Sequence, residues 1–477
     1  MKHIADPNQK NVIFCVFFIL LSSFVLSCHK EKKTPPVAQS SNAEITAVKL
    51  LKDTTNIAGS VVIQGDSVKI TVATATDLSS LTLKVTISAN ATISPADNTL
   101  QDFTHPVSYT ITAQDGTKKI YIVAVILDKL RNVVFVGGRD NHFYAYNAAS
   151  GAVLWNYAGT GSFEYASPAR YKEMVYAGNT AGVMYAFNDI TGQVAWNYTT
   201  ASAIISSPVV VDGIVYFGST DNYLYALDAQ TGALKWKYNS SNPIAVTPVV
   251  NNGKIYFSNV NYTNDATYYA IDATTGNLQW QYTDAGNHGF SNAALTNGVL
   301  CFGSGNGYFY GLNSATGALN WKYATPDKTS FIAASPVAAN GIVYAGTYFN
   351  LSFSPPAGSL YAINVADGSL AWTSLNNVGI NLGGTIDGAN LYITANDENI
   401  YDINITNGTI LWKKSITPNG ALPAVKDGVI YSYGWAGPGE GSDQLYALSA
   451  ATGNIIWQIK VKGGGTARPY VVGTDGI

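Results

Sequence analysis

Short apolar runs separated by turn residues recur from about residue 131 to the C-terminal end of the chain. Such runs, rich in Val, Ile, Tyr and Phe and bounded by Gly, Asp and Asn, predict β-strands, and no helical period competes with them. Each repeat contains four runs, so we label its predicted strands A to D. In one repeat they are A, "SPVVV" (207–211), B, "IVYFG" (214–218), C, "YLYAL" (223–227), and D, "ALKWKY" (233–238).

A motif across the turn between strands C and D marks each repeat. It ends in Trp, and a Gly stands four residues before that Trp in all eight copies, as in "ALDAQTGALKW" (226–236). Eight of the nine Trp of the chain belong to this motif, at a spacing of 40 to 51 residues. A repeat of this length predicts a propeller or a solenoid. The eight motif Trp are Trp155, Trp196, Trp236, Trp280, Trp321, Trp372, Trp412 and Trp457.

The two ends of the repeat region favour the propeller. The chain enters the region at a strand B (132–138) and ends with an unpaired strand A (467–477). Joined, these two ends complete one four-stranded blade, and a ring of eight blades closes. Radial repetition solves the problem of exposed strand edges, whereas a solenoid would need capping repeats at both ends. The sequence therefore predicts an all-β chain with an eight-bladed propeller over residues 131–477.

The residue types of the motif suit a packed turn. Gly232 lies in the turn, where a residue without Cβ tolerates a positive φ angle. Asp228 can accept hydrogen bonds from backbone amides of the turn, and Asn replaces it in five copies and Ser in one. The Trp offers a large apolar face and one N–H donor, so we expect it to pack between neighbouring blades. The eight Trp are therefore expected to be structural.

The motif is similar to the tryptophan-docking motif of the pyrroloquinoline-quinone (PQQ) repeat family, and the resemblance covers residues 131–477. Propellers of the WD type have a similar period but end on a Trp-Asp pair, which is absent here. The resemblance leaves two kinds of function open. Some members are PQQ-dependent alcohol and sugar dehydrogenases, and others are cofactor-free, including a barrel-assembly lipoprotein of the outer membrane and surface binding proteins.

Residues 43–127 form a separate predicted domain. Strand-like runs alternate with turns, and the Asp-Gly of "AQDGTK" (113–118) predicts a tight hairpin. We predict a small β-sandwich. The segment resembles an immunoglobulin-like domain that is common near the start of Bacteroidetes surface lipoproteins, and this resemblance implies a spacer role.

The N-terminal segment predicts export and lipidation. Residues 1–27 combine two Lys with an apolar run of about 16 residues, which is short for a membrane-spanning helix and typical of a signal peptide. The following Cys28 resembles the lipidated Cys of a bacterial lipobox, and His29 after it favours the outer membrane. Residues 28–42 are polar and predict a flexible tether. An uncleaved membrane anchor is the alternative.

Composition limits the classes of partner that the chain is expected to bind. Charged residues make up only 12% of the chain, the net charge is −3, and no basic stripe follows the first 33 residues, so we expect no nucleic-acid partner. If the signal peptide is removed and Cys28 carries lipid, Cys301 is the single free thiol and no disulfide can form. We expect a monomer attached to the membrane through its N-terminal lipid.

The candidate binding face lies where the D–A and B–C loops meet around the axis. Insertions fall mostly in three B–C loops, which emerge on one face of the ring, and repeat proteins commonly place binding on such a face. Aromatic and singly charged groups around one opening would suit a polar ligand, although ordinary loop polarity and packing are the alternative. The candidate residues are Glu164, Tyr165, His288, Phe290, Lys328, Phe331, Trp435 and Arg468. His142 and His288 lie in different repeats, so a zinc site is not expected.

Redox chemistry has little support in the sequence. The alcohol dehydrogenases of the resembled family carry an adjacent Cys pair over PQQ, and some add a Cys-x-x-Cys-His haem site, but Cys301 is alone. We therefore expect no cofactor and no catalytic residue. The expected function is a non-catalytic envelope lipoprotein that binds a protein or a glycan. The alternatives are a PQQ- and Ca²⁺-dependent dehydrogenase, and a hydrolase or lyase with scattered acids.

Overall fold

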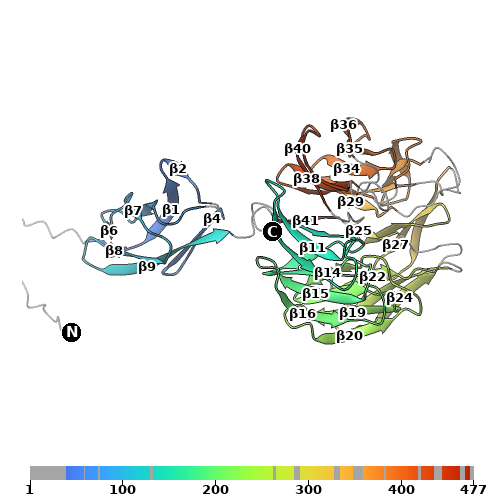
Figure 1. Ribbon diagram of the computed structural model, residues 1–477, viewed down its shortest axis with the longest axis horizontal. Helices are drawn as coiled ribbons and strands as arrows, with labels where there is room; N and C mark the ends of the chain where they lie inside the picture. The colour runs from blue at the N-terminus through green and yellow to red at the C-terminus, as the bar shows by residue number, and fades with distance from the viewer. Residues whose placement is uncertain are drawn as a thin grey trace, which may run out of the picture.

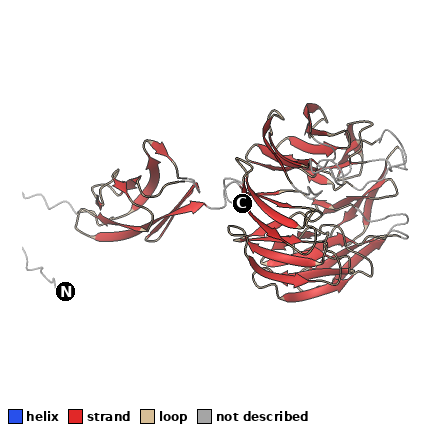
Figure 2. Ribbon diagram, viewed as in Figure 1, coloured by secondary structure: helices blue, strands red, loops and turns tan. Residues whose placement is uncertain are grey.

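The computed structural model describes residues 39–58, 60–73, 76–128, 133–261, 265–283, 291–326, 334–347, 358–380, 383–416, 421–434, 443–461 and 468–472. All regular structure within these ranges is β-strand (Figure 2). In this part of the chain, no helix has the length and apolar character that crossing a membrane requires. Cys28, the predicted lipidation site, lies outside the described residues.

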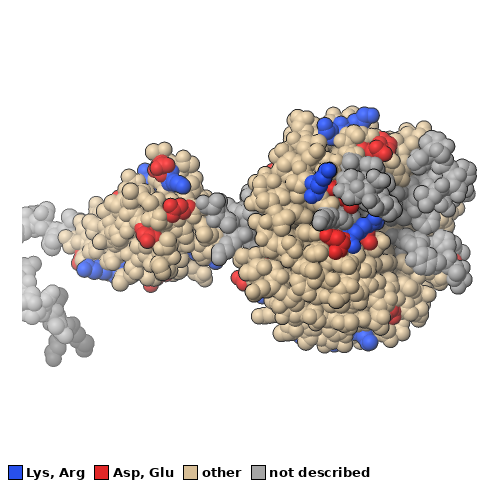
Figure 3. Space-filling view, viewed as in Figure 1, with Lys and Arg blue, Asp and Glu red and all other residues tan. Residues whose placement is uncertain are grey.

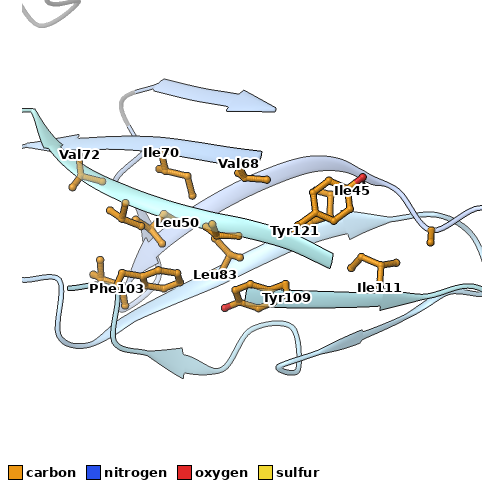
Figure 4. Packing of buried hydrophobic residues seen from close by; sticks show 14 of the residues in the cluster. Ile45, Leu50, Val68, Ile70, Val72, Leu83, Phe103, Tyr109, Ile111 and Tyr121 are labelled. Carbon is orange, nitrogen blue, oxygen red and sulfur yellow. Dashed lines mark hydrogen bonds between the residues drawn. The ribbon is translucent and has the colours of Figure 1, made fainter. Parts of the chain in front are cut away.

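The N-terminal body consists of two sheets with one core between them. One sheet has the order β2-β1-β5-β7, and the other has the order β3-β4-β9-β8-β6 with β4 and β9 parallel. The apolar side chains that both sheets turn inward form a single cluster (Figure 4). The predicted hairpin is present, because β8 and β9 pair antiparallel across the Asp-Gly turn. The strands are β1 (Ile45–Lys52), β2 (Thr55–Asn56), β3 (Ser60–Gln64), β4 (Ser67–Ala73), β5 (Leu81–Ile87), β6 (Thr92–Ser94), β7 (Leu100–Gln101), β8 (Val107–Thr112) and β9 (Lys118–Asp128).

The rest of the described chain folds into four-stranded antiparallel sheets, which we number 1 to 8 and write from the inner to the outer strand. Sheet 1 contains β41 (Tyr470–Val472), β10 (Val133–Gly137), β11 (His142–Asn147) and β12 (Val153–Ala158), and sheet 2 contains β13 (Ala169–Tyr171), β14 (Met174–Gly178), β15 (Val183–Asn188) and β16 (Val194–Thr199). Sheet 3 contains β17 (Val209–Val211), β18 (Ile214–Gly218), β19 (Tyr223–Asp228) and β20 (Leu234–Asn239), and sheet 4 contains β21 (Val249–Asn251), β22 (Lys254–Ser258), β23 (Thr267–Asp272) and β24 (Leu278–Thr283). Sheet 5 contains β25 (Ala294–Thr296), β26 (Val299–Gly303), β27 (Tyr308–Asn313) and β28 (Leu319–Ala324), and sheet 6 contains β29 (Val337–Ala339), β30 (Ile342–Gly346), β31 (Leu360–Asn364) and β32 (Leu370–Ser374). Sheet 7 contains β33 (Gly384–Asp387), β34 (Asn390–Ala395), β35 (Asn399–Asn404) and β36 (Ile410–Ser415), and sheet 8 contains β37 (Ala424–Lys426), β38 (Val429–Gly434), β39 (Gln444–Ser449) and β40 (Ile455–Lys460).

The sheets follow one another around a common centre (Figure 1). Their first strands contact each other across the centre-facing side, for example β13 with β17 and β37 with β41. Sheet 1 is assembled from both ends of the region, because β41 pairs antiparallel with β10, with Val133 opposite Val472 and Phe135 opposite Tyr470.

The inner strands are shorter than the sequence pattern predicted. Strand A was expected over 207–211, but β17 covers Val209–Val211. Pro208 lacks an N–H group and cannot donate to the ladder. The Ser207 hydroxyl accepts a hydrogen bond from the amide of Ser167, which precedes β13 of the neighbouring sheet. The closing strand, expected over 467–477, is β41 (Tyr470–Val472), and residues 473–477 lie outside the described ones.

The core of this region lies between neighbouring sheets. Each apolar cluster draws on two consecutive sheets, as when Phe135 and Phe143 of sheet 1 pack with Tyr185 and Phe187 of sheet 2. The cluster that contains Val134 and Tyr431 joins sheet 1 to sheet 8, so apolar packing continues across the two ends of the region. Burial between sheets drives their stacking, because each sheet is apolar on both faces.

The motif Trp lie at these junctions. Each indole N–H donates to a backbone carbonyl in the C–D turn of the next sheet, at 2.7 to 3.2 Å between nitrogen and oxygen. The pairs are Trp155 with Asp189, Trp196 with Ala229, Trp236 with Ala273, Trp280 with Ser314, Trp321 with Val365, Trp372 with Ile405, Trp412 with Ala450 and Trp457 with Ala148.

Two features of the structure explain why Gly occupies this position of the motif. Gly232 has a φ angle of +72°, as predicted for the turn, and Asp228 accepts bonds from the amides of Gln230 and Thr231. The ring of Trp196 from the preceding sheet also covers Gly232, and an added Cβ would stand 2.7 Å from it. A side chain at this position would therefore strain the backbone and collide with the Trp.

A Tyr on strand B reinforces the same junction. The Tyr216 hydroxyl donates a hydrogen bond to the Ala273 carbonyl at 3.2 Å. The same carbonyl accepts the bond from the Trp236 indole at 3.1 Å. Cys301 takes the place of this Tyr in sheet 5, where its side chain is 1% exposed and burial raises its pKa to about 12.

Candidate binding face at the loop end of the inner strands

One position recurs near the end of each D–A loop, two residues before the inner-strand residue that pairs with the third residue of strand B. Ser207, for example, precedes Val209, which pairs with Tyr216. Because the inner strands surround the centre, these positions form a ring, which we call the inner ring. Its members are Arg468, Ser167, Ser207, Thr247, Asn292, Ser335, Gly383 and Leu422, in the order of sheets 1 to 8.

Hydrogen bonds connect the inner ring from sheet to sheet. The amide of Ser167 donates to the Ser207 hydroxyl at 2.9 Å. The amide of Thr247 donates to the Asn292 side-chain oxygen at 2.8 Å, and the Asn292 side-chain amide donates to the Ser335 hydroxyl at 2.8 Å. Short polar side chains at these positions therefore satisfy backbone donors that have no strand partner.

Arg468 occupies the inner-ring position of sheet 1. Its amide donates to the Ser167 hydroxyl at 2.8 Å, and its Nη2 donates to the Gly384 carbonyl of sheet 7 at 3.0 Å. Its Nε is buried and has no hydrogen-bond partner among the described residues. Burial lowers the pKa of the Arg468 guanidinium, because removal from water disfavours the charged form.

Glu164 and Tyr165 lie in the loop between sheets 1 and 2. Glu164 is 8% exposed, and its carboxylate forms an ion pair with Arg139 from the B–C turn of sheet 1. Tyr165 is 46% exposed, and partial burial raises the pKa of its hydroxyl, with a smaller contribution from the Glu164 charge. The structure thus brings Glu164 to Arg139 rather than to Arg468.

The remaining candidates fall on undescribed loops. His288, Phe290, Lys328, Phe331 and Trp435 lie outside the described residues, as do much of the B–C insertions. No group of three or more His, Cys, Asp and Glu that could hold a metal ion occurs within the described ranges. His142 is half-buried beside Asp140, with 3.6 Å between its Nδ1 and the carboxylate.

Charged side chains are sparse over the face shown in Figure 3, and several of them gather near the centre of the ring of sheets. The sequence pattern identified Glu164, Tyr165 and Arg468 on these loops but missed the inner ring and Arg139. A signal for the ring was present, because Ser-Pro or Thr-Pro precedes the inner strand in four repeats, at 167–168, 207–208, 247–248 and 335–336.

Comparisons with known proteins place both parts of the chain. Residues 128–209, 201–414 and 396–475 match the family described as outer membrane protein assembly factor BamB. Residues 45–125 match a second family, described as SGBP, N-terminal. The BamB protein of Legionella pneumophila (strain Paris) is 25% identical over 146 residues, which are 30% of this chain and 34% of that protein. The chain thus spans about a third of the curated relative.

Solved structures align with the chain at low identity. BamB from Moraxella catarrhalis aligns with a TM-score of 0.53 and 18% identity, over 66% of this chain and 95% of that chain. The computationally designed Ika8 protein aligns with a TM-score of 0.53 and 16% identity, over 63% and 90%. A quinohemoprotein alcohol dehydrogenase from Pseudomonas putida HK5 aligns with a TM-score of 0.49 and 16% identity, over 64% and 69%. With the family match covering most of the described repeats, the chain belongs to the family of the outer membrane protein assembly factor BamB.

Proposed function

We propose that the protein is a non-catalytic, lipid-anchored protein of the outer membrane whose propeller presents its loop face to a protein or a glycan. In this proposal the eight sheets are the blades of one closed ring, and residues 43–127 are an Ig-like spacer. Residues 1–27 are the signal peptide, Cys28 carries the lipid, and residues 28–42 are the tether. The protein acts as a monomer.

The family match supports the location and the kind of partner. BamB proteins are described as outer membrane assembly factors, and this family covers residues 128–475 in three overlapping segments. The match of residues 45–125 to the SGBP N-terminal family adds a glycan as a possible class of partner. Both relationships fit a chain that binds at the cell envelope.

The geometry supports the loop face as the binding surface. The observation that carries the proposal is that all eight motif Trp are engaged between sheets, whereas the loop end presents the polar inner ring and the half-exposed Tyr165. Tyr is enriched at interfaces because it combines a large apolar face with a hydroxyl. Hydroxyl and amide side chains suit a polar ligand.

We propose that this function needs no PQQ and no Ca²⁺. A quinone enzyme requires an acidic base and a set of oxygen ligands for Ca²⁺. Glu164, the acid that could serve as the base, is ion-paired with Arg139, and Cys301 is buried within sheet 5. Neither residue supplies a set of oxygen ligands for Ca²⁺, and we derive no redox step.

The test measures binding and redox activity on the same mature protein. Envelope proteins are captured by photo-crosslinking, and glycans are screened on an array, with wild type, Tyr165→Ala and Leu234→Ala. Leu234 is an exposed apolar residue on an outer strand, so its variant controls for general loss of apolar surface. We expect Tyr165→Ala alone to reduce binding. Dye reduction with PQQ, Ca²⁺ and an alcohol or aldose, abolished by Glu164→Gln, would instead establish the dehydrogenase.

A further inference from the structure

Arg468 differs in charge from every other member of the inner ring. The equivalent positions of sheets 2 to 6 hold Ser, Thr or Asn, and those of sheets 7 and 8 hold Gly383 and Leu422. A short polar side chain is sufficient for the bonds that link neighbouring sheets. The guanidinium of Arg468 is therefore an addition to the ring that its packing does not require.

The side chain of Arg468 links sheet 1 to sheet 7, which does not neighbour sheet 1. Its backbone amide donates to the Ser167 hydroxyl of sheet 2. Its Nη2 donates to the Gly384 carbonyl of sheet 7. The side chain is thereby held at its backbone and at one nitrogen of the guanidinium.

The charge of Arg468 is not balanced within the described chain. Of the three described arginines, Arg139 pairs with Glu164 and Arg170 pairs with Asp189, whereas no described acid pairs with Arg468. Its Nε–H points at no acceptor among the described residues and is buried. A desolvated cation with an unused donor is costly unless an anion completes it.

We propose that Arg468 anchors a carboxylate-binding site at the inner ring, which takes the carboxylate of an acidic sugar. A planar guanidinium presents parallel N–H donors that match the two oxygens of a carboxylate, and the single bond from Nη2 to Gly384 leaves other N–H groups of the guanidinium for a ligand. The Ser167 hydroxyl, next to the Arg468 backbone, can contribute a further donor. This site rests on the proposed function in that the acidic sugar is the ligand of the same loop face.

Isothermal titration of the mature protein tests the site with three probes: D-galacturonate, its neutral counterpart D-galactose, and acetate. The variants are Arg468→Met, Arg468→Lys and the control Lys460→Met, which removes one exposed positive charge from outer strand β40. We expect wild type and Lys460→Met to bind galacturonate equally and to prefer it to galactose. Arg468→Met should lose at least about tenfold in affinity, or about 1.4 kcal/mol, and Arg468→Lys should lose less.

The outcomes separate this site from the general proposal. If galacturonate and acetate both fail to bind wild type, the carboxylate site is wrong, whereas binding of a protein or neutral glycan in the screen above would leave the platform standing. Equal galacturonate affinity in wild type and Arg468→Met would assign Arg468 a structural role only. If Arg468→Met does not fold, the titrations of Arg468→Lys and the salt dependence of wild type test the site instead. The proposal requires that NaCl weaken galacturonate binding and leave galactose binding unchanged.

Discussion

The indole N–H of Trp457 donates to the backbone carbonyl of Ala148 at 2.8 Å, although the two residues stand 309 positions apart in the chain. The Tyr431 hydroxyl donates to the same carbonyl at 3.3 Å. The same pair of donors, one Trp and one Tyr, joins five of the other seven pairs of neighbouring sheets, and it is repeated here between sheet 8 and sheet 1. The last repeat thus docks on the first as it would on a following repeat.

Removal of the closing strand should destabilise the ring more than removal of a whole domain. Deletion of residues 468–477 takes away β41 and exposes the edge of β10, and it uncovers Val134 and Phe135, which are fully buried. We expect a loss of at least about 3 kcal/mol, the scale of one large buried side chain. Deletion of residues 43–127 should leave the melting temperature of the repeat region almost unchanged. Equal melts of the two deletion proteins would contradict the closure.

Substitution of a motif Gly should cost more than substitution of a Gly with the same backbone. Gly232 and Gly253 both have a φ angle of +72°, but only Gly232 is covered by a Trp, whereas nothing lies within 4 Å of a Cβ at Gly253. We expect Gly253→Ala to cost about 1–2 kcal/mol from backbone strain. Gly232→Ala should cost about 1–3 kcal/mol more, because Trp196 must move. Urea unfolding followed by Trp fluorescence measures both, and equal costs would show that the Trp contact adds nothing.

A buried acid on strand C makes stability depend on pH. Asp402 is 1% exposed and accepts two bonds from the Asn390 side-chain amide, at 2.9 and 2.7 Å. Burial raises its pKa, and bonds from Asn390 and Trp412 only partly oppose this effect. The other repeats hold a small residue here, at Ala145, Ala186, Ala226, Ala270, Gly311, Ala362 and Ala447.

We predict that Asp402→Asn and Asp402→Ala become more stable relative to wild type as the pH rises. In the unfolded chain the carboxyl ionises near pH 3.8, and in the folded protein it ionises at a higher pH. The stability that the protonated group contributes is therefore complete below pH 3.8 and is lost as the pH rises through the folded pKa. Melting temperatures from pH 3.5 to 7.5 test this, and a constant difference between wild type and both variants would refute it.

The lipid anchor is tested at Cys28. In the native host, Cys28→Ser should move the protein from the membrane fraction to the soluble fraction, because a lipid chain on this residue is the proposed attachment. Metabolic labelling with a fatty-acid analogue should mark wild type and not the variant. Persistence of Cys28→Ser in the membrane fraction would favour the uncleaved anchor.

The strands, the turns and the repeat could be predicted from local sequence. These depend on local chemistry: Gly232 permits a positive φ, Asp228 binds amides two and three residues ahead, and apolar runs bounded by turn residues form strands. The partner strand for the chain end was also predictable, because the region begins with a strand B and ends with a strand A. The length of the inner strands was not predicted, because the bond that the Ser207 hydroxyl accepts comes from Ser167 of another repeat.

Contacts between residues far apart in the chain became known from the folded structure. Gly232 must lack a side chain because a Trp from another sheet covers it. The Tyr216 hydroxyl bonds to a carbonyl 57 residues away in the chain. Likewise, Glu164 and Arg468 lie on the same set of loops, yet Glu164 pairs with Arg139 and Arg468 extends to Gly384. A repeat period specifies each sheet, but the direction of a long charged side chain depends on the space left by the sheets around it.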